Sequence, residues 1–336
     1  MICLQILRKL FFVSCLGGAF LMVQGQHRVT AAGKVLSLPG NEPIQFANIG
    51  ILNSAVGTIS NPDGSFSIEI PGNHFNDSII FSALGYGKKF IPVSAFAAKT
   101  DSTIYLMETP SFLNEVVVTG KRWARKVYRR GHRTFEGGAL YLDTVSAGSA
   151  MALLIRNKNA FRGIQYEYPV YLENAQVRIV NNTFSEFKVR VRLLDKDSVG
   201  VPGKDLLNQS VVIRSAIHNG WLNVDLSPYK IMVKRDFYIV FEWILDANDR
   251  HYLYTQYQDY IKKYPNRITI DYSLIDSKRV PFVNFKSVNW GTSFGIDVSP
   301  GALKQEVCYL RWNSFGTWIR SPTILTAGVT VSTRLP

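Results

Sequence analysis

The side chains that most often carry catalysis form no pattern that is typical of a known reaction. The sequence has five histidines, His27, His74, His132, His218 and His251, and none is followed by glutamate three residues later. Zinc peptidases hold their metal through such a His-x-x-Glu pair and a distant histidine, because zinc takes nitrogen and carboxylate ligands around an open position. A carboxylate pair for glycoside hydrolysis is set in space and not in sequence, so that alternative stays open. We predict no catalytic residues, no metal and no cofactor.

Two oxygen-rich strings contain part of a calcium site. The string Asp195-Lys196-Asp197-Ser198-Val199-Gly200 begins like a calcium loop. Val199, however, stands where an oxygen ligand is needed, and the distal glutamate is missing. Asp246, Asn248 and Asp249 form the second string. We predict solvated hairpin turns at both places.

A cluster of tyrosines is the candidate ligand-binding site. Tyr252, Tyr254, Tyr257 and Tyr260 follow the most apolar segment of the chain. Exposed tyrosines offer flat faces that stack on sugar rings. If the segment is a strand, Tyr252 and Tyr254 share one of its faces. The prediction is a contact with a glycan or a peptide, and its alternative is ordinary packing at the edge of a sheet.

The N-terminal segment has the composition of a secretory signal peptide. Arg8 and Lys9 precede an apolar stretch over residues 10–23, and the small Gly25 follows. This pattern predicts an exported protein that is cleaved after Gly25, with residues 1–25 as the signal. Cys308 is then the one cysteine of the mature chain, so an intramolecular disulfide is excluded. Its strand-like neighbours predict a buried thiol that behaves as a small apolar side chain.

Residues 26–119 have the alternation expected of a β-sandwich. Short runs of period two are separated by turn residues at intervals of about 8 to 12. In the clearest run Phe66, Ile68 and Ile70 alternate with polar side chains, after the turn Asn61-Pro62-Asp63-Gly64. Proline presets φ and glycine accepts a positive φ, so the chain can reverse there with little strain.

Four strings in this segment also carry a resemblance to a known family. They are Gly33-Lys34-Val35, Pro43-Ile44-Gln45-Phe46-Ala47-Asn48-Ile49, Gly57-Thr58-Ile59-Ser60-Asn61-Pro62-Asp63-Gly64-Ser65-Phe66 and Phe81-Ser82-Ala83-Leu84-Gly85-Tyr86. Together they resemble the carboxypeptidase-regulatory-like domain over about 90 residues. The resemblance implies a seven-stranded transthyretin-like sandwich, common in bacterial envelope proteins, that serves as a non-catalytic accessory module. It brings no peptidase activity with it.

Residues 120–138 form a predicted basic linker. Lys121, Arg122, Arg125, Lys126, Arg129 and Arg130 lie in it, with no acid before Glu136. Helical spacing of Trp123 and Val127 suggests a short amphipathic helix that ends near Gly131. Such a helix can lie on anionic lipid headgroups. The alternative is a solvated linker with Trp123 packed against one domain.

Residues 139–336 predict a second, larger β domain. Phe187, Val189, Val191 and Leu193 alternate with charged residues, which indicates a strand with one buried and one charged face, while residues 237–245 are apolar at nearly every position and predict a central strand covered on both sides. Further strands are expected over 177–180, 222–226, 268–272 and 329–331, and residues 146–155 fit either a helix or a strand. Turn and core strings such as Gly220-Trp221-Leu222-Asn223 are similar to jelly-roll accessory domains.

Charge and composition limit the functions of this all-β protein. The net charge is +13, of which Arg8 and Lys9 contribute +2, leaving +11 on the mature chain, because residues 1–25 contain no acid. Such a balance favours anionic partners. Export makes nucleic acid the least suitable of them. We expect a non-catalytic binding module for a glycan or an envelope protein, located in the periplasm, the outer membrane or at the cell surface. The alternative is a structural component of an envelope complex.

Overall fold

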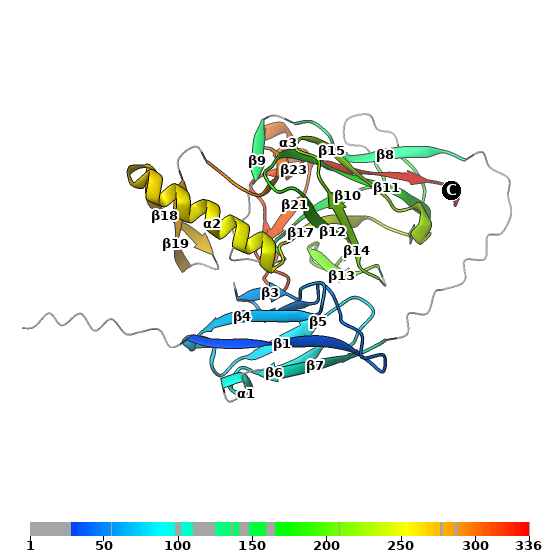
Figure 1. The fold of residues 1–336 in the computed structure, drawn as a ribbon. Coiled ribbons are helices and arrows are strands. Elements are labelled where there is room, and N and C mark those ends of the chain that lie inside the picture. The colour runs from blue at the N-terminus through cyan, green and yellow to red at the C-terminus, as the bar shows by residue number, and fades with distance from the viewer. Residues whose placement is uncertain are drawn as a thin grey trace, which may run out of the picture.

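Two β domains lie one against the other in a computed structural model of the chain (Figure 1). The structure describes residues 28–54, 56–97, 102–109, 125–135, 137–140, 148–158, 165–207, 209–275, 278–285 and 288–335. The predicted signal peptide lies outside these residues. None of the described helices is long and apolar enough to cross a membrane.

The first domain is a sandwich of a three-stranded and a four-stranded sheet. In the three-stranded sheet the central β1 pairs with β4 in antiparallel and with β7 in parallel orientation. The elements are β1 (Arg28–Leu38), β2 (Asn48–Ile51), β3 (Gly57–Ile59), β4 (Ser65–Pro71), η1 (Gly72–His74), β5 (Ser78–Ser82), β6 (Lys89–Pro92), α1 (Ser94–Ala97) and β7 (Ser102–Met107). The order in the four-stranded sheet is β3-β2-β5-β6.

Alternation along β4 builds the core of this domain as predicted. Phe66, Ile68 and Ile70 are buried, whereas Ser67 and Glu69 are exposed. The buried side chains pack against residues of the other sheet, and the Phe66 ring meets the Phe81 ring edge to face at 5.3 Å. Because successive side chains of a strand point to opposite faces, one apolar residue in two is enough to close the sandwich.

The second domain stacks a seven-stranded on an eight-stranded sheet, and its strand pairs are antiparallel. The first sheet has the order β13-β12-β17-β10-β21-β22, with β14 paired to β12. Its strands are β10 (Ala150–Ile155), β12 (Phe187–Lys196), β13 (Pro202–Asp205), β14 (Val211–Ser215), β17 (Phe237–Ile244), β21 (Cys308–Arg311) and β22 (Ile319–Arg320). In the segment 146–155, which the sequence left open between helix and strand, residues 150–155 form the strand β10.

The second sheet has the order β23-β20-β11-β24-β8, with β15 and β16 paired to β11 and β9 paired to β20. Its strands are β8 (Val127–His132), β9 (Gly138–Leu140), β11 (Val170–Asn182), β15 (Gly220–Asp225), β16 (Met232–Val233), β20 (Thr292–Asp297), β23 (Ile324–Leu325) and β24 (Ala327–Ser332). Together with the first sheet it confirms the predicted all-β, stacked-sheet class.

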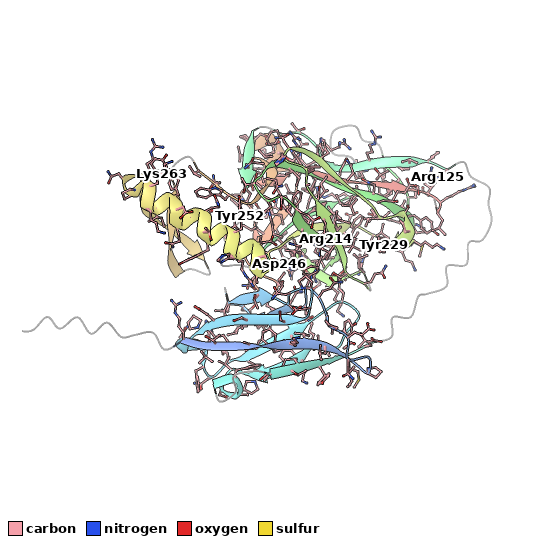
Figure 2. The ribbon with its side chains drawn as sticks, in the orientation of Figure 1. Arg125, Arg214, Tyr229, Asp246, Tyr252 and Lys263 are labelled. Atoms are coloured by element: carbon pink, nitrogen blue, oxygen red, sulfur yellow. The ribbon has the colours of Figure 1, made fainter. Side chains whose placement is uncertain are left out.

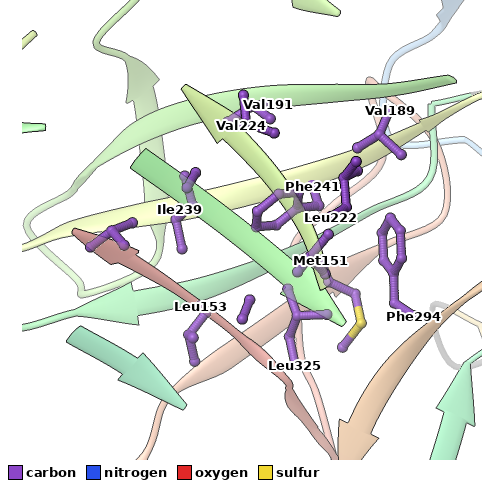
Figure 3. Packing of buried hydrophobic residues seen from close by; sticks show 14 of the residues in the cluster. Met151, Leu153, Val189, Val191, Leu222, Val224, Ile239, Phe241, Phe294 and Leu325 are labelled. Carbon is purple, nitrogen blue, oxygen red and sulfur yellow. The ribbon is translucent and has the colours of Figure 1, made fainter. Parts of the chain in front are cut away.

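Apolar side chains from both sheets fill the space between them (Figure 3). Val191 and Phe241 come from one sheet, and Val224 and Phe294 from the other. All eight residues of β17 are buried, so the prediction of a central strand covered on both sides is confirmed. Moving each such side chain out of water stabilises the folded domain by about 1.5–3 kcal/mol. This apolar burial supplies most of the stability of a domain without a disulfide.

Outside the sandwich lie α2 (Ala247–Lys263) and the hairpin of β18 (Ile268–Ile275) and β19 (Lys278–Phe285). Figure 1 shows α2 and this hairpin at one side of the second domain. The remaining elements are η2 (Ser227–Tyr229), η3 (Pro265–Arg267) and α3 (Pro300–Gln305).

The predicted helix in the basic linker is wrong. Residues 127–132 form β8, which pairs with β24 throughout its length, so the second domain begins inside the predicted linker 120–138. The physical reason is the period of the buried positions: Arg130 and His132 are buried, and Tyr128 is partly buried, while Val127 and Arg129 are exposed. A period of two fits a strand and not a helix. Gly131, at φ 104°, lets the two strands approach, because a Cβ there would lie 2.5 Å from the Ala327 carbonyl oxygen.

Candidate functional site: the junction of the two domains

The charged face of β12 is buried as well as its apolar face. Lys188 and Arg190 are 7% and 4% exposed, and Arg192 is mostly covered. Alternation predicted that these residues share a face but not that the face is covered. The reason lies in tertiary structure, because the first domain packs over this sheet and supplies partners for Arg190.

Three arginines at this junction form ion pairs with one glutamate. Glu242 of β17 is fully buried and accepts hydrogen bonds from Arg190 Nη1 at 2.8 Å, Arg192 Nη1 at 3.1 Å and Arg311 Nη2 at 2.9 Å. Burial alone raises the pKa of Glu242, but the three guanidinium groups outweigh it and lower the pKa below its ordinary value. Burial and the neighbouring Arg192 lower the pKa of Arg311 to about 10. The carboxylate and the guanidinium groups are therefore charged at neutral pH.

Arg190 also joins the two domains through hydrogen bonds. Arg190 donates through Nη1 to Asn48 Oδ1 at 2.9 Å and through Nη2 to the Phe46 carbonyl oxygen, both in the first domain. Ser314 of the second domain also donates to Asn48 Oδ1, at 2.9 Å. Phe46 and Ile59 pack against Ile244 of β17 in a small apolar cluster across the junction.

Two further contacts extend the junction on either side. On one side, Asn313 Nδ2 donates to the Ser54 carbonyl oxygen, and the Asn53 amide donates to the Phe315 carbonyl oxygen at 3.1 Å. This approach requires Gly50, because a Cβ there would lie 3.0 Å from the Phe315 ring. On the other side, Arg250 of α2 donates to Thr58 Oγ1 at 2.7 Å.

A pocket of about 200 Å³ opens between the domains beside the arginines. Gln45, Asn48 and Tyr86 of the first domain line it together with Arg190 and Arg192 of the second. Burial, followed by the charges of Glu108 and Glu42, raises the pKa of Tyr86, so its phenol keeps its proton at neutral pH. The pocket thus has guanidinium groups at one side and a neutral phenol at another.

The tyrosine cluster lies on a helix, so the expectation that Tyr252 and Tyr254 share one face of a strand is wrong. Tyr252, Tyr254, Tyr257 and Tyr260 belong to α2, where residues two apart point to different sides. Tyr252 packs on Phe184 and donates to the Thr183 carbonyl oxygen at 3.0 Å, and Figure 2 shows it on the side of α2 that faces the sandwich.

Of the other three tyrosines, two are packed against the domain and one is exposed. Tyr257 and Tyr260 pack on Trp290 with ring centres 4.8 Å and 5.5 Å apart. Tyr254 alone of the four is exposed, at 61%. Three of the four side chains thus hold α2 against the rest of the domain and share no open face with Tyr254.

The basic residues of the predicted anionic-surface contact divide into three groups. Lys121 and Arg122 lie outside the described residues. Arg125, Lys126 and Arg129 are exposed, and Arg125 forms an ion pair with Glu173. Arg130 is buried between the rings of Tyr128 and Tyr166, at 5.3 Å and 4.9 Å from their centres. It is therefore not available to a lipid surface.

The two oxygen-rich strings have structural roles. Asp197 Oδ1 accepts from the amides of Val199 and Val201, which closes the predicted hairpin turn. Asp246 does not lie in a turn: it caps α2 by accepting from the amides of Asn248 and Asp249, at the end of the helix beside the first domain (Figure 2). That part of the prediction is wrong. Within the described ranges no three His, Cys, Asp or Glu side chains are grouped so that they could hold a metal ion.

One arrangement with the residue types of a catalytic triad was not predicted from sequence. His74 Nδ1 lies 2.7 Å from Asp77 Oδ2, and its Nε2 lies 3.4 Å from Ser54 Oγ. Ser54 Oγ also accepts from the Val56 amide, and none of these three residues lines the junction pocket. The contacts tie the β2–β3 hairpin to the segment after β4. Their spacing of 20 residues along the chain left no sequence signal.

Two other nucleophile positions are buried. Contrary to the prediction that the sequence contains no catalytic pattern, the string Gly291-Thr292-Ser293-Phe294-Gly295 has the Gly-x-Ser-x-Gly spacing of a nucleophile elbow. Ser293, however, is a fully buried residue of β20, and its Oγ accepts a hydrogen bond from the Asn181 amide. An elbow instead presents its serine on a sharp turn between a strand and a helix. Cys308 lies in β21 as predicted and is fully buried. Burial raises the pKa of its thiol to about 12, so it is not a thiolate nucleophile.

Comparison with known proteins identifies the first domain alone. No curated protein matches the chain. One family model matches the chain, and the match covers most of β1, all of β2 to β7 and the junction residues Gln45, Asn48 and Tyr86. Residues 31–118 match the family model of the CarboxypepD_reg-like domain, and the first β-sandwich is therefore a carboxypeptidase-regulatory-like domain.

Proposed function

We propose that this protein is an exported, non-catalytic binding module that recognises a glycan or a protein at the junction of its two domains. The observation that carries the proposal is the pocket to which both domains contribute polar side chains, with Arg190 and Arg192 on one side and Gln45 and Tyr86 on the other. Ligand sites occur preferentially at domain junctions, where two rigid elements converge on one space. The regulatory-like, non-catalytic character of the matched domain supports a binding role.

Export rests on the sequence. Arg8 and Lys9, the apolar stretch over residues 10–23 and Gly25 have the order of a secretory signal. The buried, protonated Cys308 suits an oxidising compartment, because a thiol without solvent access does not form mixed disulfides. These observations support a location in the periplasm, the outer membrane or at the cell surface.

The second candidate function is structural, as a component of an envelope complex. It is favoured by exposed apolar side chains on strands at the edges of the first domain. Phe90 of β6 is 60% exposed and Met107 of β7 is 64% exposed. Strands at sheet edges with exposed apolar side chains are surfaces on which other chains pair.

The test of the binding module uses the mature chain with two matched variants. Ser210→Trp places an indole at the exposed Ser210, which lines the junction pocket, and Ser198→Trp places it in the exposed turn after β12. Each protein is applied to an array of bacterial surface glycans and used to recover partners from crosslinked envelopes. We expect the native chain and Ser198→Trp to bind the same glycan or protein and Ser210→Trp to lose it.

Equal binding by Ser210→Trp would remove the junction as the site, and no binding by the native chain would remove the binding module. A single protein recovered at fixed stoichiometry, and lost in Phe90→Ser/Met107→Ser but not in Ser210→Trp, would replace it with the structural function.

A further inference from the structure

We infer that the junction pocket takes the carboxylate and hydroxyl groups of one acidic sugar, a hexuronate. This inference rests on the proposed function and names the ligand class of the same site. It is carried by positive charge that the described part of the protein does not neutralise and by hydrogen-bonding groups in the pocket that have no protein partner within that part.

The charge at the pocket is positive. Arg190, Arg192 and Arg311 converge on Glu242, and Arg192 also pairs with Asp205 through Nε at 2.7 Å. Among the described residues, three guanidinium groups thus face two carboxylates in a largely buried cluster. One more negative group would balance the cluster, and its attraction to the guanidinium groups would be stronger there than in water, because the surroundings have a low dielectric.

A donor for that negative group is available on Arg192, which lines the pocket together with Arg190. Arg192 uses Nε and Nη1 for carboxylates, and its Nη2 has no hydrogen-bond partner among the described residues. Arg190 Nε also has no partner in the same part of the chain, but it is buried and has no accessible surface for a ligand atom, so Arg190 contributes its positive charge to the pocket. Guanidinium groups match a carboxylate particularly well in geometry.

The rest of the lining carries groups that suit hydroxyls. Within the described residues, the Gln45 side chain, the Tyr86 hydroxyl, the Ser210 hydroxyl and Asn48 Nδ2 make no hydrogen bond to the protein, although Asn48 Oδ1 does. Amides and hydroxyls both donate and accept, which is what sugar hydroxyls require. A ligand with a carboxylate alone would leave this part of the pocket unused.

Charge also orients the ligand. Burial raises the pKa of Tyr86, and the negative charges of Glu108 and Glu42 raise it further, so the Tyr86 side of the pocket is unfavourable for an anion. The carboxylate therefore lies toward Arg190 and Arg192, and the hydroxyls lie toward Tyr86. The volume of about 200 Å³ is below the roughly 300–1,000 Å³ of pockets for drug-sized ligands, which fits a single sugar residue.

The inference is tested by isothermal titration calorimetry of the mature chain with galacturonate, galactose and acetate. We expect galacturonate to bind at least tenfold more tightly than either of the others, because only galacturonate satisfies both sides of the pocket. Arg192→Lys keeps the charge but loses the forked donors, and we expect it to weaken galacturonate at least tenfold. Arg214→Lys is the matched control on the neighbouring β14, where Arg214 pairs with Glu186 in solvent, and it should bind as the native chain does (Figure 2).

Gln45→Ala provides a variant that leaves the arginine cluster intact, so it decides the result if Arg192→Lys does not fold. It should weaken galacturonate severalfold and leave the unfolding midpoint unchanged. Equal affinity for galactose, equal affinity for acetate, or full affinity in both pocket variants would each overturn the hexuronate. If a neutral glycan on the array binds the native chain but not Ser210→Trp, the hexuronate inference fails and the proposed function stands.

Discussion

Glu242 illustrates how a fully buried carboxylate stays ionised when charge surrounds it. Its two oxygen atoms accept from three guanidinium groups, and these lower its pKa although burial opposes the charge. A buried ion pair contributes little net stability, because desolvation offsets attraction. Removal of one partner is far more costly, because the remaining charges are then buried without compensation.

Glu242→Gln should therefore destabilise the protein by about 3–5 kcal/mol, since it leaves Arg190, Arg192 and Arg311 without their shared anion. Urea denaturation followed by tryptophan fluorescence measures the change. Glu186→Gln is the control, because Glu186 pairs with Arg214 in solvent and such pairs contribute about 0–1 kcal/mol. Equal losses in the two variants would show that the cluster is not electrostatically coupled.

A second buried pair gives a dependence on pH. His132 Nε2 lies 2.7 Å from Asp297 Oδ2, and the Ser299 amide donates to Oδ1 at 2.7 Å. Burial raises the pKa of Asp297, but the bonds from Ser299 and His132 outweigh it and hold the pKa below its ordinary value. The stability that this carboxylate contributes is complete above about pH 4, the ordinary range of an aspartate, and is lost as the pH falls through the lowered pKa.

Asp297→Asn should be less stable than the native chain near neutral pH, and the difference should shrink as the pH falls below about 4 and through the lowered pKa, because the native carboxylate becomes protonated there. Urea midpoints of the two proteins at several pH values measure it. A difference that stayed constant over this range would rule out the lowered pKa.

At the scale of elements, α2 begins where a helix cap and an ion pair share one side chain. Asp246 caps the helix through the amides of Asn248 and Asp249, and its other oxygen lies 3.0 Å from Lys188 Nζ of β12. In turn, Asp249 Oδ2 accepts a hydrogen bond from the Asp246 amide, and it lies 2.8 Å from the same Lys188 Nζ. The start of α2 is therefore fixed to the charged face of β12.

Asp246→Ala should destabilise the protein by about 1 kcal/mol more than Asp246→Asn, because asparagine caps a helix as well as aspartate does and alanine does not. Both variants lose one carboxylate at Lys188, so their difference isolates the cap. Thermal and urea unfolding measure it, with the exposed Asp259→Ala as a control that should change stability by less than about 0.5 kcal/mol. Equal losses in the alanine and asparagine variants would argue against the cap.

At the scale of the whole molecule, the two sandwiches share one interface of polar and apolar contacts. Arg190 reaches the backbone of the first domain, Arg250 bonds to Thr58, and Ile59 packs against Ile244. Neither domain can separate without exposing the Glu242 cluster on one side and Ile59 on the other. The domains should therefore unfold together.

Differential scanning calorimetry of the mature chain should show one transition. Ile59→Ser places an unsatisfied hydroxyl in the apolar cluster with Phe46 and Ile244, and we expect it to split the transition in two. Leu52→Ser is the control, since Leu52 is 59% exposed and lies in the same part of the first domain. Two separate transitions in the native chain would mean that the interface does not couple the domains.

The sequence pattern predicted those features of the fold that depend on residues close together in the chain. Alternation placed Phe66, Ile68 and Ile70 in a core, because side-chain direction along a strand depends only on position. The continuous apolar run placed the whole of β17 in a sheet centre, because such a strand must be covered on both faces. The rule of alternation, applied to β12, put Lys188 and Arg190 on one face together. It did not reveal that this face is buried.

Where local patterns were ambiguous, the prediction failed. The tyrosines of α2 and the arginines of β8 fit both a helix and a strand, and only pairing with β24 and packing on Trp290 settled which one forms. The junction was beyond prediction for a stronger reason. Arg190 is 142 residues from Asn48 and 52 from Glu242, so the contacts that define the pocket arise from how two finished sandwiches meet, and no local rule of the chain contains that information.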